Sequence, residues 1–226
     1  MRLKICIEYD GTSYVGWQKQ QNGRSIQEEV EKCLKKIFKQ DISIFGAGRT
    51  DAGVHAINQV AHFDINNNLD LNSVLASMNF FLRKNKNSIS ILNIKKVSKN
   101  FHARFSVKKK VYAYKILNRK SQSPLSSGKS WFIPYFIDLE AMENASKFLL
   151  GENDFNAFRS KNCQSTKSIR TINQINFKKL KDEIVIRILA KSFLHNQVRI
   201  IVGSLVNVGR GHWEPIKLHQ ILKKKR

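Results

Sequence analysis

The spacing of apolar residues along this chain switches repeatedly between alternation and a helical period. Near the N-terminus Leu3, Ile5 and Ile7 alternate with polar residues, which predicts a half-buried strand. A Ser–Glu pair typical of a capping box then opens a run of apolar residues three and four apart, which predicts a helix over residues 26–38. Segments of both kinds follow, without the regular strand–helix–strand order of a parallel sheet. The pattern indicates an α+β fold with mainly antiparallel sheet.

Further elements are expected on the same grounds. Strands are predicted over residues 42–47, 59–64, 89–97, 104–117, 172–177 and 183–190, and helices over residues 71–81, 138–149 and 194–208. The strand at 183–190 has apolar residues on both faces, which is typical of the interior of a sheet. The two halves have a loosely similar order of elements, and we place the boundary near residue 104. The expected domains are therefore residues 1–104 and 105–226.

The charge of the chain restricts the class of partner. Lys and Arg number 40 against 17 Asp and Glu, a formal net charge of +23 over 226 residues. Such an excess suggests a polyanionic partner, either nucleic acid or an acidic membrane surface. A genome-wide bias towards Lys, accompanied here by abundant Asn and Ile, is an alternative that needs no partner.

The positions of the cysteines and histidines indicate whether the chain forms disulfides, whether it binds a metal ion, and in which cellular compartment it works. The three cysteines are far apart and form no CxxC pair, and the six histidines have no metal-ligand spacing. We expect neither a disulfide framework nor a bound metal. No stretch approaches the roughly 18 apolar residues of a membrane span, and the alternating N-terminus does not resemble a signal peptide. A protein of the reducing cytoplasm fits these features best.

One short segment between two predicted strands has the composition of a site. Residues 48–56 read GRTDAGVHA, with Asp51 two positions after Arg49 and glycines on both sides. Glycines permit close approach of a ligand, and a nearby guanidinium can keep a carboxylate ionised and oriented. From the spacing alone, an Arg–Asp pair that only holds the turn together explains the segment equally well.

The same segment resembles the characteristic loop of the TruA-type tRNA pseudouridine synthases, and other segments resemble that family in the same order. They are YDGTSYVGWQKQ at 9–20, FHARFS at 101–106, the Tyr112-x-Tyr114 pair, GENDFNAFRS at 151–160, CQSTKSIRTI at 163–172 and FLHNQVRIIVGSLVNVGRG at 193–211. The likeness thus extends over nearly the whole chain.

The resemblance implies a set of site residues. Asp51 is similar to the catalytic aspartate of the family, and Arg49 to the arginine that pairs with it. Tyr112 resembles the tyrosine that stacks on the target base, and Arg199 a second-half residue that faces the same cleft. The implied fold has two similar halves whose mainly antiparallel sheets join, with helices packed on the sheet and the catalytic cleft between the halves.

The resemblance also implies a homodimer that converts uridine to pseudouridine at positions 38, 39 and 40 of the tRNA anticodon stem-loop. This reaction breaks the N1–C1′ bond and forms a C5–C1′ bond, so no cofactor is expected. A carboxylate with a pKa of about 4 is ionised at neutral pH and can attack without a general base; attack of Asp51 on C1′ or on C6 stays open. The ring of Tyr112 can hold the uracil by stacking, and its hydroxyl is a candidate for the C5 proton. The target uridine must leave its stack.

Two features depart from the family. Lys110 stands where an arginine is more usual, and the chain stops at Arg226, before a further segment and a final strand that family members have. Because that strand normally contributes to the second-half sheet, we expect the 226-residue chain alone to be less stable and more prone to aggregation than an extended version.

Two rival functions use the charge differently. A catalytically silent RNA-binding protein of the same fold would need the basic surface but not Asp51 with Arg49. A membrane-surface protein would need a basic amphipathic helix with large apolar anchors, whereas the helices predicted here have ordinary polar faces.

Overall fold

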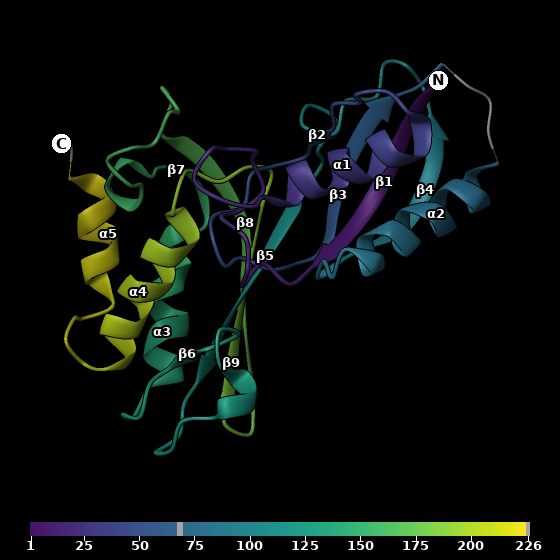
Figure 1. The fold of residues 1–226 in the computed structure, drawn as a ribbon. Helices are drawn as coiled ribbons and strands as arrows, with labels where there is room; N and C mark the ends of the chain where they lie inside the picture. The colour runs from purple at the N-terminus through teal and green to yellow at the C-terminus, as the bar shows by residue number, and fades with distance from the viewer. Residues whose placement is uncertain (67–69, 225–226) are drawn as a thin grey trace. The chain divides into compact units, whose positions relative to one another are not determined.

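A computed structural model of the chain describes residues 1–66 and 70–224. The chain folds as two compact units, Met1–Val107 and Lys108–Arg226, and each unit has one sheet and its own hydrophobic core (Figure 1). The α+β class predicted from the sequence is confirmed. The sequence placed the boundary near residue 104, and the division into domains 1–104 and 105–226 stays a prediction.

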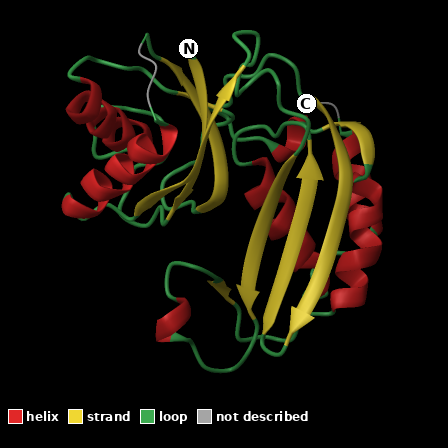
Figure 2. Cartoon of the chain, turned by 90° about the vertical axis from the view of Figure 1, so that its right-hand side faces the viewer, coloured by secondary structure: helices red, strands yellow, loops and turns green. Residues whose placement is uncertain are grey.

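The sheet of the first unit has four strands in the order β2–β3–β1–β4, and its three pairings are antiparallel. The strands are β1 (Arg2–Tyr9), β2 (Phe45–Gly46), β3 (Ala56–Asp64) and β4 (Ile89–Val97). Strand β1 lies between β3 and β4, and its Leu3, Ile5 and Ile7 are fully buried, as the alternation predicted. The helices α1 (Ile26–Phe38) and α2 (Leu71–Lys84) cover the face of the sheet that carries these residues (Figure 2).

Helix α1 begins and ends where its sequence predicts. The side chain of Ser25 accepts a hydrogen bond from the Glu28 amide, which satisfies one of the free donors of the first turn. Lys39 follows the helix with φ 57°, the left-handed conformation that often ends a helix. Between these caps Val30, Cys33 and Leu34 are buried against the sheet. The predicted bounds of 26–38 are therefore confirmed.

The sheet of the second unit has five strands in the order β6–β5–β9–β8–β7. They are β5 (Lys110–Leu117), β6 (Trp131–Phe132), β7 (Gly151–Asp154), β8 (Ile169–Leu180) and β9 (Glu183–Ala190). Strand β5 pairs with β6 in parallel, and the other three pairings are antiparallel. Strand β9 pairs on both sides, so the predicted interior position of residues 183–190 is confirmed.

Three helices lie together on one side of this sheet (Figure 1). They are α3 (Leu139–Ser146), α4 (Gln197–Gly209) and α5 (Ile216–Lys223). Short 3-10 turns occupy Pro124–Ser126, Lys147–Leu149 and Asn156–Phe158. The core beneath the helices includes Ile184, Ile186 and Ile188 of β9.

Two predicted strands are shorter in the structure. The strand expected over 42–47 is reduced to β2, because Ile42 and Ile44 are buried in the core without belonging to the sheet. The strand expected from residue 104 begins at Lys110, because residues 101–106 fold back on themselves: the Ser106 amide donates to the His102 carbonyl at 2.8 Å. The elements β6, β7 and α5 were not predicted.

Candidate active site

The loop that carries Asp51 connects β2 to β3 in the first unit. At its start, the side chain of Gln59 on β3 donates a hydrogen bond to the Gly48 carbonyl at 2.6 Å. The Val54 amide donates to the Asp51 carbonyl at 3.2 Å, which closes a turn around the aspartate. Asp51 is half-buried and Arg49 is exposed. The backbone on both sides of the aspartate is therefore held by the fold, while the pairing of Arg49 with Asp51 stays a prediction.

The loop that follows β1 lies directly against the Asp51 loop. The Trp17 amide donates to the Thr50 carbonyl at 3.0 Å, and the Gly53 amide donates to the Tyr14 carbonyl at 3.4 Å. The hydroxyl of Tyr9, at the end of β1, lies 2.8 Å from the hydroxyl of Thr50. These bonds flank position 51 on both sides, so the segment 9–20 acts as the support of the Asp51 loop.

Two glycines permit this close contact. Gly16 has a φ of +113°, and a β carbon there would lie 2.5 Å from the Thr50 carbonyl oxygen. A β carbon on Gly11 would lie 2.1 Å from the Val54 carbonyl oxygen. Both distances are far shorter than van der Waals contact, so a side chain at either position would displace the loop that carries Asp51.

A histidine that the sequence reasoning did not single out ties down the far end of the loop. Nδ1 of His55 lies 3.1 Å from Oδ1 of Asp10 and 3.2 Å from the Gly11 amide nitrogen. One nitrogen cannot donate to Asp10 and accept from Gly11 at once, so Nδ1 makes the first bond when it carries a hydrogen and the second when it does not. The same Asp10 oxygen accepts from the amide and the hydroxyl of Thr12, at 2.9 and 2.6 Å. The only sequence signal for this role was the place of His55 inside GRTDAGVHA.

The other two expected site residues lie in the second unit. Tyr112 is half-buried on β5, opposite the fully buried Ile188 of β9. Its ring meets the ring of Phe193 nearly at a right angle, with centroids 5.0 Å apart. Arg199 is exposed on α4, the helix that follows Phe193. Asp51 and Arg49 thus belong to one unit and Tyr112 and Arg199 to the other, and the convergence of the four stays a prediction.

The segment next to Phe193 is bonded to the loop before β8. Nδ1 of His195 lies 2.7 Å from the Ser160 hydroxyl, and the Ser160 amide donates to the His195 carbonyl at 3.1 Å. Burial acts to raise the pKa of the nearby Cys163 thiol, but backbone hydrogen bonds and the charges of Arg159 and Arg170 outweigh burial and lower it. Periodicity gave no sign of these contacts, because they join loops.

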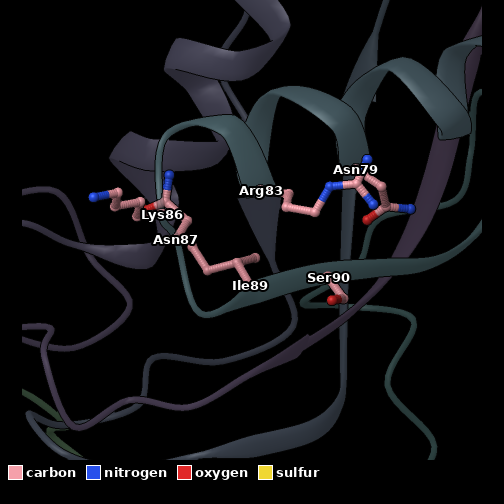
Figure 3. A pocket seen from close by; sticks show the side chains of 6 residues that line it. All are labelled: Asn79, Arg83, Lys86, Asn87, Ile89 and Ser90. Atoms are coloured by element: carbon pink, nitrogen blue, oxygen red, sulfur yellow. The ribbon is translucent and has the colours of Figure 1, made fainter.

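An open pocket of about 520 Å³ lies where α2 ends and β4 begins (Figure 3). It is lined by Asn79, Arg83, Lys86, Asn87, Ile89 and Ser90. The Asn79 side chain accepts from the Ile91 amide at 2.8 Å and donates to the Ile91 carbonyl at 2.9 Å, so it is engaged in holding the edge strand β4. None of the four expected site residues lines this pocket.

The structure describes residues 1–66 and 70–224. No group of three or more His, Cys, Asp or Glu side chains in these ranges is placed to hold a metal ion. Within the same ranges, no helix combines the length and the apolar character needed to cross a membrane.

Comparison with known proteins gives matches over almost the whole chain. A family model described as tRNA pseudouridine synthase matches residues 5–106 and 145–226. A protein named tRNA pseudouridine synthase A from Anaplasma phagocytophilum is 43% identical, over 100% of this chain and 92% of its own length. Proteins of the same name from Anaplasma marginale and Ehrlichia chaffeensis are 42% and 44% identical, with 92% and 91% of their lengths covered.

Proposed function

Because the chain belongs to the tRNA pseudouridine synthase family, we propose that it converts uridine to pseudouridine at positions 38, 39 and 40 of the tRNA anticodon stem-loop, with Asp51 as the nucleophile. The enzyme is an isomerase. The choice of Asp51 as the nucleophile rests on the way its loop is held. The Asp51 carbonyl accepts a hydrogen bond, and so do the backbone carbonyls of Gly48 and Thr50 on one side, while the Gly53 amide donates one on the other. A nucleophile must be held within a few tenths of an ångström of its target, and a loop anchored in this way provides that position.

In the proposed mechanism the Asp51 carboxylate attacks the target nucleoside and the N1–C1′ bond breaks. The detached uracil turns so that C5 faces C1′, and the C5–C1′ bond forms. The bond to Asp51 breaks and regenerates the carboxylate, C5 loses its proton, and N1 takes up a proton. The product has the same atoms as the substrate. The guanidinium of Arg49 pairs with the carboxylate and orients it, and the ring of Tyr112 holds the uracil by stacking while it turns.

We further infer that the active site is a cleft between the two halves, to which Tyr112 and Arg199 contribute from the second half. The protein is proposed to act as a homodimer in the cytoplasm. These inferences are supported by the resemblance of the segments that carry the four residues to the corresponding segments of the family.

The proposed function is tested with unmodified tRNA as substrate. The protein is incubated with the tRNA, and pseudouridine is mapped by carbodiimide treatment and primer extension. Asp51→Ala is expected to abolish isomerisation and to leave the affinity for tRNA within a few-fold, since the phosphate contacts remain. Asp41→Ala is the matched control, because Asp41 is an exposed carboxylate of the same unit that pairs with Lys35; its activity should equal that of the wild type.

The same assay separates the enzyme from a catalytically silent RNA-binding protein. Binding of tRNA by the wild type without any conversion of uridine would favour the silent protein. Substantial turnover by Asp51→Ala would instead show that Asp51 is not the nucleophile. Conversion at sites outside the anticodon stem-loop would contradict the proposed positions and leave the chemistry intact.

A further inference from the structure

Five aromatic rings gather on the first unit's sheet, on the side opposite α1 and α2. They belong to Phe45, His62, Phe101, His102 and Phe105, and we call them the aromatic cluster. The ring centroid of His102 lies 4.4 Å from that of Phe105 and 4.7 Å from that of His62. The Phe45 and His62 rings are stacked at 5.2 Å. Because His62 alternates along β3 with the buried core residues Ala61 and Phe63, the cluster lies on the face turned away from the core.

The turn that presents Phe105 is held rigidly from inside and from the sheet. The His102 amide donates to the Ser106 hydroxyl at 3.0 Å, and the Ser106 amide returns a bond to the His102 carbonyl at 2.8 Å. The Ala103 amide donates to Nδ1 of the buried His62 at 3.2 Å. The turn also receives a hydrogen bond from Arg2 of β1, whose guanidinium donates to the Phe101 carbonyl at 2.7 Å. The backbone of the turn that carries Phe105 is thus anchored to the sheet.

The outer rings of the cluster remain open to solvent. The Phe105 side chain is 75% exposed and that of Phe45 is 51% exposed. The rings of Phe45 and Phe105 both contact the ring of His102, so their exposed faces belong to one patch rather than to scattered single side chains. A contiguous exposed apolar patch is typical of a contact surface.

Positive charge accompanies the rings. The Arg104 guanidinium lies 5.9 Å from the centre of the Phe105 ring, and the Lys4 ammonium lies 6.0 Å from that of Phe101. Aromatic faces interleaved with cations bind single-stranded nucleic acid, because bases stack on the rings while the cations contact phosphate. An apolar protein partner would not use these charges, whereas RNA uses both features.

We propose that Phe105 and Arg104 form a binding site for an unpaired nucleotide of the tRNA, with the Phe105 ring against the base and the Arg104 guanidinium on the adjacent phosphate. The inference rests on the proposed function, since it takes tRNA as the substrate. The ligand is a base with a free face, as in the loop of a stem-loop or beside a nucleotide that has left its stack. A paired stem offers no such face, so the site distinguishes the loop from the stem.

The test compares variants of the full chain in binding to two RNAs. One is an unmodified anticodon stem-loop, and the other is a duplex of the same stem without the loop. All variants carry Asp51→Ala, so that no conversion disturbs the equilibrium. Phe105→Ala is expected to weaken stem-loop binding about tenfold, the effect of losing one base stack, and to leave duplex binding within twofold. Phe136→Ala, which removes an 82% exposed ring from the second unit, is the matched control and should change neither.

A second variant reports the stack directly. Phe105→Trp keeps an aromatic face and should bind the stem-loop as tightly as the parent, which is the chain that carries Asp51→Ala alone. Its fluorescence, after subtraction of the signal of the three native tryptophans, should be quenched by the stem-loop and not by the duplex. Because the Phe105 ring is exposed, the melting temperature of Phe105→Ala should match that of the parent, which separates lost binding from lost folding.

Defined results overturn the proposal. Equal stem-loop affinity of the parent and Phe105→Ala would do so, as would equal losses for stem-loop and duplex. A change in sedimentation from dimer to monomer with unchanged RNA affinity would assign Phe105 to contact with a second copy of the chain. The proposed function is judged separately: absence of isomerisation by the wild type refutes that function, while a stem-loop-specific loss in Phe105→Ala would still support the nucleotide site.

Discussion

In the first unit, the hydrogen bond between the His62 ring and the Ala103 amide depends on the protonation of that ring. The residue is 1% exposed, and its Nδ1 accepts the hydrogen bond from the Ala103 amide. Burial lowers the pKa of His62, and the charges of Arg2 and His102 lower it further. The ring is therefore neutral at neutral pH. Protonation of Nδ1 would replace its lone pair by a hydrogen and break the bond to Ala103.

The stability of the chain should consequently fall as the pH drops. The folded pKa lies below that of the unfolded chain, about 6.5, so the unfolded state takes up the proton first. The stabilisation is present above pH about 6.5 and is lost as the pH falls through the folded value. Urea unfolding between pH 8 and pH 5 should show this decline for the wild type, and a smaller one for His62→Gln. His212→Gln, at an exposed histidine, is the control; the same slope for His62→Gln as for the wild type would contradict the assignment.

Tyr112 allows the stacking role and the proton-transfer role to be separated. Tyr112→Phe keeps the ring and its edge contact with Phe193 but removes the hydroxyl, so kcat should fall far more than the affinity for tRNA. Tyr112→Ala should damage both, with a loss of affinity of about 1–3 kcal/mol from the stack. Tyr114→Phe, two residues along the same strand, is the matched control. Single-turnover kinetics and equilibrium binding are the measurements, and equal rates for the wild type and Tyr112→Phe would remove the hydroxyl from the mechanism.

At the scale of elements, the sequence was most informative where one residue pattern determines one structure. The alternation in β1 and the cap at Ser25 set those elements almost to the residue. It was least informative where an element depends on contacts from elsewhere. Strand β2 keeps two residues because Ile42 and Ile44 are buried in the core outside the sheet. Residues 101–106 turn back, and His62, distant in sequence, accepts a hydrogen bond from the Ala103 amide in this turn. The short helix α5 rests on the second core through Leu218, a contact that eight residues of pattern do not reveal.

The support of the Asp51 loop makes a prediction about Gly16. Gly16→Ala forces a residue with a β carbon into φ +113° and places that carbon against the Thr50 carbonyl. We expect a loss of stability of about 1–2 kcal/mol from the backbone conformation alone, and a fall in kcat because the loop shifts. Gly203→Ala in α4 is the control, since a β carbon there meets nothing within 4 Å and alanine favours the helix. Thermal unfolding and the pseudouridine assay measure both effects; an unchanged kcat in Gly16→Ala would show that the loop tolerates the shift.

At the scale of the whole molecule, the sequence could identify the site residues but not their assembly. Asp51 and Arg49 lie in a segment whose resemblance to the family is long, and the structure shows how neighbouring backbone holds that segment. Tyr112 and Arg199 lie in the other unit, and their convergence with Asp51 stays a prediction, because no local sequence pattern describes it. The contacts of Phe193 and His55 were not predicted because both are made between segments remote in sequence.

The net charge of +23 gives a prediction for the molecule as a whole, because it separates a binding surface from a bias in composition. If lysines and arginines contact tRNA phosphates, each contact releases counterions, and the logarithm of the affinity falls with the logarithm of the salt concentration by about 0.7–0.9 per contact. The affinity of Asp51→Ala for unmodified tRNA, measured by filter binding from about 50 to about 300 mM salt, should therefore decline steeply. Replacing the exposed Lys108 and Lys109 by glutamine reduces the slope if they face the RNA and leaves it unchanged if they do not.

Phe105→Ala should lower the affinity at every salt concentration without altering the slope, since a base stack releases no counterions. A flat affinity across the series would attribute the lysine excess to composition and leave the stacking contacts as the main source of binding.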